Sequence, residues 1–310
     1  MSVTTTSNYG SMSNAWAHRA LLKRSKPRNV HNLFGMAFDL PEKNTDTMSF
    51  RRQENFNSDP VVLPEGADPA PETLNKFDIQ VQVQEFGKVT LLSRKVLLVV
   101  EDDTAYGTAD NLSQCMHTML DKVTRDVWDA SVAQISCLNG ANGNAVTELT
   151  QDDVNRAIAY LDENDTEKTT PVIEGTSRFG TGPIEEAYWV AAHVKLKPDI
   201  RSLDAFTPTS QYGSQEPVLQ AEFGATDEAR WVTSTLVKVS TANPPVYNNT
   251  FVGANAYGFV KIDKVSTEVI LKPLGFNDYL NRFQSMGFTA WFNAAILDES
   301  HIVTLLSTKA

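Results

Sequence analysis

One long stretch, residues 108–135, constrains the fold of this chain more than any other. Its apolar residues recur at steps of three and four, the repeat of one stripe on an α-helix. The stripe consists of Leu112, Met116, Met119, Val123, Val127 and Ala130, with charged residues such as Asp121 mainly between them. Neither proline nor glycine interrupts the run, so the pattern predicts a helix roughly 40 Å long. Such a rod needs other elements along its length, and we expect a long core helix in an α+β protein.

The composition is that of a folding chain. Of 310 residues, 41% are hydrophobic and 21% are charged. The longest dense apolar run, residues 96–100, is too short for a membrane helix, so we expect no membrane partner. The first residues lack the basic start and apolar middle of a secretory signal. Cys115 and Cys137 are too few for a disulfide framework, and we expect reduced thiols in a cytosolic compartment.

Charge is distributed unevenly along the chain. The net charge is −11, yet the first 38 residues contain no acidic residue, so the remainder carries −16. The basic residues of this N-terminal part are Arg19, Lys23, Arg24, Lys26 and Arg28. Residues 15–26 are expected to form a short helix that Pro27 ends. A basic arm on an acidic body favours docking on a neighbouring subunit or a polyanion, with a solvated tail as the alternative. Apolar residues such as Trp16, Val30 and Phe34 favour a docked arm.

Residues 47–83 predict a long β-hairpin. A strand-like piece at residues 47–50 leads through Arg51 and Arg52 into a proline-rich tip, and residues 77–83 then alternate between apolar and polar. Because an isolated ribbon is only marginally stable, we expect it to lie on another subunit, although packing on its own domain is the alternative. Adjacent strand residues face opposite ways, so at most one of the two arginines faces the body. We expect at least one to meet an acidic residue of an adjacent subunit; the alternative is a solvated side chain.

The rest of the chain alternates between helical and strand-like segments. Thr150 is expected to cap an amphipathic helix with a buried face of Val154, Ala157, Ile158 and Leu161. The remaining assignments are strand-rich segments at 87–100 and 265–271, a buried strand at 187–193, a short helix at 198–206, a loop at 222–226, strands at 230–234 and 251–260, and a closing hairpin of 288–296 with 302–306.

Catalytic and metal-binding signatures are poor. The segment around Ser177 has G-x-S-x-x-G spacing, whereas a hydrolase nucleophile elbow needs G-x-S-x-G, so a glycine-rich turn is the better interpretation. The five histidines, including His193, show no metal-ligand spacing, and there is no phosphate-binding loop. We therefore predict no catalytic residue, no cofactor, no metal and no enzyme activity.

Several ordered segments together resemble one family. They are His18–Pro27 (HRALLKRSKP), Thr47–Arg52 (TMSFRR), Leu63–Gly66 (LPEG), Tyr188–His193 (YWVAAH) with Asp199–Asp204 (DIRSLD), and Gly287–Asp298 (GFTAWFNAAILD). In this order they are similar to the major capsid proteins of tailed bacteriophages with the Hong Kong 97-type coat fold, particularly those of podophages similar to phage N-four. The resemblance covers about residues 15–306. No lysine–asparagine pair for the covalent cross-link of one capsid subgroup is identified.

The resemblance implies a division of the chain and a structural function. The N-terminal arm would be residues 1–34, the extended loop 35–86, the peripheral domain with the spine helix 87–137, the axial domain 138–262, and the closing strands of the peripheral domain 263–310. Copies would form pentamers and hexamers of an icosahedral shell around double-stranded DNA, without sequence-specific contacts. Portal, scaffolding and decoration proteins are further expected partners, and the protein would lie in the virion and, during assembly, in the host cytoplasm. The alternatives are an encapsulin-like cage subunit and a soluble α+β enzyme.

Overall fold

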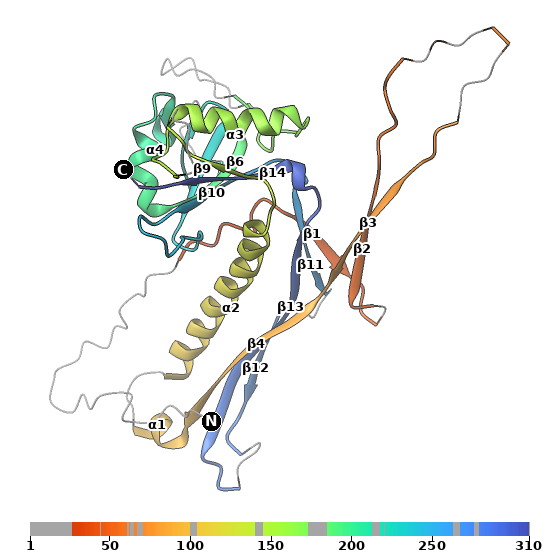
Figure 1. The fold of residues 1–310 in the computed structure, drawn as a ribbon. Helices are drawn as coiled ribbons and strands as arrows, with labels where there is room; N and C mark the ends of the chain where they lie inside the picture. The colour runs from red at the N-terminus through yellow and green to blue at the C-terminus, as the bar shows by residue number, and fades with distance from the viewer. Residues whose placement is uncertain are drawn as a thin grey trace.

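The computed structural model describes residues 27–43, 45–60, 62, 65–66, 71–99, 104–139, 145–172, 185–212, 218–219, 221–262, 267–275 and 279–309. These residues form a seven-stranded sheet, a five-stranded sheet, a two-stranded ribbon and one long helix (Figure 1). The ribbon projects away from both sheets, at the upper right of Figure 1. The mixed α+β class that the sequence predicts is confirmed.

The five-stranded sheet is built around one long central strand. Its strands are β1 (Met36–Leu40), β4 (Gln84–Ser93), β11 (Tyr257–Ile262), β12 (Thr267–Lys272) and β13 (Phe283–Ile296). Strand β13 pairs antiparallel with β4, β11 and β12, and β1 adds to β11 in parallel. The predicted alternation along residues 288–296 is confirmed, since Phe288, Ala290, Phe292 and Ala294 are buried.

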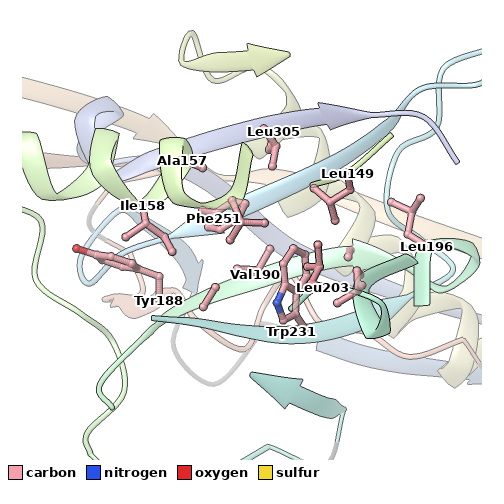
Figure 2. Close-up of a cluster of buried hydrophobic side chains, with 14 of the residues drawn as sticks. Leu149, Ala157, Ile158, Tyr188, Val190, Leu196, Leu203, Trp231, Phe251 and Leu305 are labelled. Atoms are coloured by element: carbon pink, nitrogen blue, oxygen red, sulfur yellow. The ribbon is translucent and has the colours of Figure 1, made fainter. Parts of the chain in front are cut away.

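The seven-stranded sheet has the order β5-β14-β10-β6-β9-β8-β7. Its strands are β5 (Gln134–Ser136), β6 (Tyr188–His193), β7 (Phe206–Pro208), β8 (Glu222–Thr226), β9 (Ala229–Ser234), β10 (Tyr247–Val252) and β14 (Ile302–Ser307). Every residue of β6 is buried, as expected for a central strand covered on both faces. This sheet contributes to two hydrophobic cores. Figure 2 shows one of them, in which side chains of helix α3 (Gln151–Glu163) cluster with Phe251, Leu305 and Trp231.

The predicted α3 is confirmed, and its sequence explains it. Thr150 is the residue before the helix, but its side chain does not cap the backbone; its hydroxyl donates to Asp153 Oδ2 at 2.6 Å instead. Asp152 and Asp153 lie in the first turn, where the positive end of the helix dipole stabilises carboxylates. The four residues of the predicted apolar face are all buried. The remaining helices are α1 (Arg94–Val99), α2 (Thr104–Asp129) and α4 (Lys197–Arg201), with three short 3₁₀ turns at Val194–Leu196, Thr209–Gln211 and Glu299–His301.

The long helix exists, but its limits differ from the prediction. Helix α2 ends at Asp129, and the chain then forms β5, where Ile135 pairs with Leu305 of β14. Ala130, predicted on the buried stripe, is exposed. The sequence favoured continued helix because neither proline nor glycine interrupts residues 130–135; the parallel pairing of β5 with β14 determines the conformation instead. Leu112 and Met116 do pack on the sheet, against Met286 and Phe288 of β13.

Two other strand assignments were wrong for the same reason. Residues 288–296 and 302–306 do not form a hairpin, because β13 lies in the five-stranded sheet and β14 pairs with β10 and β5 in the seven-stranded one. The expected single strand at residues 251–260 is two strands, β10 and β11, in different sheets. Asn255, with a φ of 58°, adopts the left-handed conformation that turns the chain between them.

Smaller corrections concern local segments. Residues 94–99, expected in a strand-rich segment, form α1, and residues 222–226, expected as a loop, form β8. The helix predicted over residues 198–206 is limited to α4. The predicted glycine-rich turn around Ser177 and the predicted arm helix at residues 15–26 lie outside the described residues.

The sheets divide the chain differently from the predicted domains at several places, including β5 of the predicted segment 87–137, which joins the seven-stranded sheet. Strand β11, inside the predicted axial segment 138–262, lies in the sheet of β13. Strand β14, inside the predicted closing segment 263–310, lies in the sheet of β6 and β10. The long helix bridges these regions, since its first half packs on β13 while Trp128 near its end contributes to a core beneath β6 and β9.

Candidate assembly surfaces

The hairpin is buried at its base, and its outer apolar side chains are exposed within the described part of the chain. Strands β2 (Thr47–Gln53) and β3 (Lys76–Gln82) pair antiparallel over seven residues each, which confirms the predicted hairpin. At the base, Val81 and Val83 are buried against Leu40 of β1 and Val260 of β11. Further out on the same face of β3, the side chain of Phe77 is 56% exposed. Among the described residues, the apolar face of the ribbon is therefore buried only at one end.

The two hairpin arginines face opposite ways, as the sequence predicts, but both have partners within their own chain. Arg51 Nε donates to Oδ1 of Asp78, its direct cross-strand neighbour, at 2.9 Å. Both side chains are exposed. Arg52 faces the body and forms an ion pair with Asp298, in the turn after β13. The contact expected with an adjacent subunit is thus already made inside one chain, and an intersubunit role for either arginine stays a prediction.

Asp298 connects the hairpin to the body. An open cleft of about 380 Å³ lies there, with Phe50, Arg52, Asn255, Asp298 and His301 among its lining residues. Asp298 Oδ1 accepts hydrogen bonds from the backbone N–H and the hydroxyl of Ser300. Partial burial by itself raises the pKa of Asp298, but these hydrogen bonds and the charges of His301 and Arg52 lower it more, so the pKa lies below its ordinary value. The carboxylate is held ionised where it meets Arg52.

The end of the predicted arm is attached to the long helix by a buried polar contact. The backbone N–H of His31 donates to Asp121 Oδ1 at 2.8 Å, and its ring Nδ1 lies 2.7 Å from Asp121 Oδ2. Both side chains are almost fully buried. The carbonyl oxygen of His31 accepts from the Tyr257 hydroxyl, and Asn32 accepts from Thr124 of the helix.

Aromatic packing surrounds this contact. Trp128 lies edge-on to His31, with ring centroids 4.9 Å apart, and Phe34 stacks on Trp189 at 5.1 Å. Burial raises the pKa of the Tyr257 hydroxyl well above its ordinary value, so it remains a donor at neutral pH. Residues 30–34, assigned by sequence to an arm that docks elsewhere, therefore pack largely on their own chain.

The burial of Asp121 was not predicted from the sequence, because charged residues between the apolar positions of a helix usually face solvent. Asp121, Thr124 and Trp128 are separated by three and four residues, so they share one helix face. All three are buried, while Val123 and Val127 of the predicted stripe are only half-buried. The tryptophan at this spacing was the available signal that the buried face turns toward Asp121.

Of the five basic arm residues, the structure describes only Arg28. Arg19, Lys23, Arg24 and Lys26 lie outside the described residues. Arg28 is exposed, and its carbonyl oxygen accepts from Ser234 of β9. Burial lowers the pKa of Lys197, and the positive charges of Arg201 and Arg28 lower it further. These three cations thus lie near one another at one side of the seven-stranded sheet.

The residues considered for catalysis form no reactive group in the described part of the chain. Ser177 lies outside the described residues. His193 ends β6, and its Nδ1 accepts from the backbone N–H of Lys195 at 3.1 Å. Burial, together with the charge of Lys195, lowers the pKa of His193. Among the described residues, no group of three or more histidine, cysteine or acidic side chains is arranged to hold a metal ion.

Two further sequence predictions concern cysteines and membranes. Cys115 and Cys137 are both free thiols, as expected, and burial raises the pKa of Cys137 well above its ordinary range. None of the helices within the described residues is long and apolar enough to cross a membrane.

Comparison by sequence gives no relative, whereas comparison by structure gives many. No protein-family model matches the chain, and no curated protein does. A capsid chain of cyanophage Pam1 superposes with a TM-score of 0.69 at 13% identity, covering 100% of this chain and 98% of that one. The capsid of Ralstonia phage GP4 gives 0.67 at 12% identity, covering 97% and 96%. The SrpI encapsulin complex of Synechococcus elongatus PCC 7942 gives 0.59 at 9% identity, covering 98% and 95%.

These likenesses establish the fold over nearly the entire chain. It is the fold of tailed-phage major capsid proteins, and the Hong Kong 97-type architecture that the sequence resemblance implies is confirmed. The SrpI encapsulin has the same fold, so the fold by itself does not distinguish a phage capsid protein from an encapsulin-like cage subunit.

Proposed function

We propose that this chain is the major capsid protein of a tailed bacteriophage. Its copies form pentamers and hexamers, which assemble into an icosahedral shell around double-stranded DNA. The observation that carries the proposal is the near-complete superposition on phage capsid chains. It is supported by the outer part of the hairpin, where the described residues of one copy leave Phe77 exposed. Head-to-tail contacts that close into rings give each hairpin a neighbour to lie on.

The same argument assigns no enzymatic role. The structural relatives reported above are shell-forming proteins, and His193 has a local structural role at the end of β6. We propose that replacing Ser177 or His193 by Ala removes no hydrolase activity. A reproducible turnover that is lost in either variant contradicts the structural assignment.

The partners follow from the shell. The acidic body favours packaging of DNA without tight adhesion, because like charges repel the phosphates. A portal protein, and scaffolding or decoration proteins, are the further partners that we propose, with the protein in the host cytoplasm before it enters the virion. Electron microscopy of the purified protein tests the central claim: closed shells or ring-shaped capsomers support it, and discrete small particles contradict it.

Cargo distinguishes the phage coat from the encapsulin-like alternative. Particles isolated from the native source are expected to contain double-stranded DNA and to carry a portal at one vertex. Particles that instead contain an enzyme and no DNA support the alternative of a protein cage.

The arm supplies a second test, with limits taken from the structure. Val30 and His31 are fully buried in their own chain, so a deletion through residue 34 removes part of the core. Deletion of residues 1–26 leaves this core intact, and we expect a folded protein that fails to form regular shells. Retention of the wild-type melting temperature is the control for folding, and normal shells from the truncated protein contradict a role of the arm in assembly.

A further inference from the structure

Strand β12 leaves one edge of the five-stranded sheet open. It pairs with β13 from Thr267 opposite Ala290 to Lys272 opposite Ser285, and within the described residues no strand pairs with its other side. It forms the outer margin of the lower part of this sheet in Figure 1. An open strand edge presents backbone N–H and C=O groups that accept another strand.

The side chains of β12 protect this edge only in part. Val269 is 60% exposed and Leu271 is 56% exposed, and being two residues apart they share one face of the strand. Edge strands are commonly protected by charges along the strand, bulges or proline within it. Here the charges, Glu268 and Lys272, flank the two exposed apolar residues, and Pro273 follows the strand.

The sequence of β12 is complementary to itself in one register. In an antiparallel pair, two facing residues either both direct their backbone N–H and C=O groups toward the partner strand or both direct them away from it. When a strand pairs with its own copy, the two-fold axis therefore lies between two copies of the same residue. With the axis at Ile270, Glu268 faces Lys272 twice and Val269 faces Leu271 twice. Moving the axis to Val269 places Glu268 opposite Ile270, and moving it to Leu271 places Val269 opposite Pro273. Opposite charges and apolar pairs across strands stabilise a sheet, so the Ile270 register is favoured.

We infer that β12 of one copy pairs antiparallel with β12 of a second copy across a two-fold axis at Ile270, joining two five-stranded sheets into one. The inference rests on the proposed function, because a closed shell needs contacts between rings as well as within them. Each side contributes only six residues, far less than the roughly 800 Å² per partner of a stable complex. The contact is therefore weak in an isolated pair of chains and is reinforced by the assembly.

Disulfide trapping tests the register. In a Cys115→Ser background, an Ile270→Cys variant places two thiols directly opposite each other, within reach of a disulfide. The matched control is Val269→Cys, whose thiols would lie on a diagonal of about 7–8 Å, which is too long. We expect at least about tenfold more covalent dimer for Ile270→Cys. A mixture of Val269→Cys with Leu271→Cys chains is expected to form the mixed dimer. Equal trapping of Ile270→Cys and Val269→Cys overturns the inference.

Charge exchange gives an independent test that needs no new thiol. Glu268→Lys and Lys272→Glu each place like charges opposite each other, whereas an equimolar mixture of the two variants restores both opposite-charge pairs across the axis. We expect each variant alone to shift assembly to several-fold higher protein concentration, and the mixture or the double variant to return it to the parent value. Single variants that assemble like the parent, or a folded double variant that remains defective, overturn the inference.

The two proposals fail in different ways. Shells without trapping at Ile270 contradict the β12 contact and leave the proposed function standing. Trapping at Ile270 in concentrated soluble protein that never forms shells or capsomers supports the contact and contradicts the proposed function.

Discussion

The seven-stranded sheet and the β2–β3 ribbon are both antiparallel in large part, yet they differ in how far their apolar side chains are buried. In the sheet, β6 and β9 are buried along their whole length between two hydrophobic cores. In the ribbon, burial is limited to the base, and Phe77 is more than half exposed. Within the described residues, the sheet therefore buries its own apolar side chains, whereas the outer ribbon leaves some of its apolar side chains exposed.

This difference predicts that substitutions affecting folding and substitutions affecting assembly lie in different regions. Substitutions in the sheet are expected to change the free energy of unfolding of one chain. Substitutions in the outer ribbon are expected to leave that free energy nearly unchanged and to act only when copies associate. The variants below test this separation, in order of decreasing effect on the stability of the single chain.

Trp231→Ala is expected to have the largest effect. The indole is fully buried between Phe251 and neighbouring side chains, and its Nε1 donates to Thr226 Oγ1 at 2.9 Å. Loss of a buried tryptophan typically costs about 3–5 kcal/mol. Denaturant unfolding followed by circular dichroism measures the change. A loss below about 1 kcal/mol contradicts a self-sufficient sheet.

Asp121→Ala is expected to destabilise the chain by about 3 kcal/mol, because it leaves the buried ring and backbone N–H of His31 without an acceptor. Hydrogen exchange is expected to increase at residues 28–34 more than in the seven-stranded sheet. The matched control is Asp126→Ala, which changes an exposed acid on the same helix. Equal exchange in the two variants argues against this attachment of the arm.

Val81→Ala and Phe77→Ala compare the two ends of one strand. Val81 is 3% exposed in the core at the hairpin base, so its truncation is expected to cost about 2 kcal/mol. Phe77 lies on the same face but outside that core, and its truncation is expected to change the stability of the single chain by less than about 0.5 kcal/mol. Shell yield by electron microscopy is expected to fall for Phe77→Ala even so. Normal shells from Phe77→Ala show that the outer ribbon is not an assembly surface.

Arg52→Glu is expected to change the global stability least, while loosening the hairpin by placing a carboxylate beside Asp298. Arg51→Glu is the control, since it changes a pair within the ribbon alone. Increased hydrogen exchange at residues 47–53 in Arg52→Glu only is the expected result, and assembly of Arg52→Glu is expected to become more dependent on salt. Equal exchange in both variants contradicts an anchoring role for Asp298.

The pH dependence of hydrogen exchange in the hairpin tests the contact with Asp298 as well. Because the pKa of Asp298 is lowered in the folded chain, its stabilising contribution is present above the ordinary aspartate pKa and is lost as pH falls through the lower folded value. The hairpin contact is thus expected to persist at pH 5 and to weaken only below about pH 4. Hairpin exchange that rises already between pH 7 and pH 5, in the wild-type protein, contradicts this assignment.

The sequence by itself determined the elements whose patterns are local. Four features follow from backbone geometry within one segment. They are the repeat of three and four in α2, the apolar face of α3, the alternation in β3 and β13, and the opposite directions of Arg51 and Arg52. The resemblance of several ordered segments then gave the fold, even though no sequence comparison finds a relative.

Only the tertiary structure decided which segments pair. The end of α2, the separation of β13 from β14 and the strand β8 depend on partners far away in the chain, and short apolar runs do not encode those partners. The burial of Asp121 has the same origin, because a carboxylate is stable inside the protein only where His31, 90 residues away, supplies two hydrogen-bonding groups. The spacing of apolar residues indicates which face of a helix or strand is buried, and the rest of the fold determines which segments cover that face.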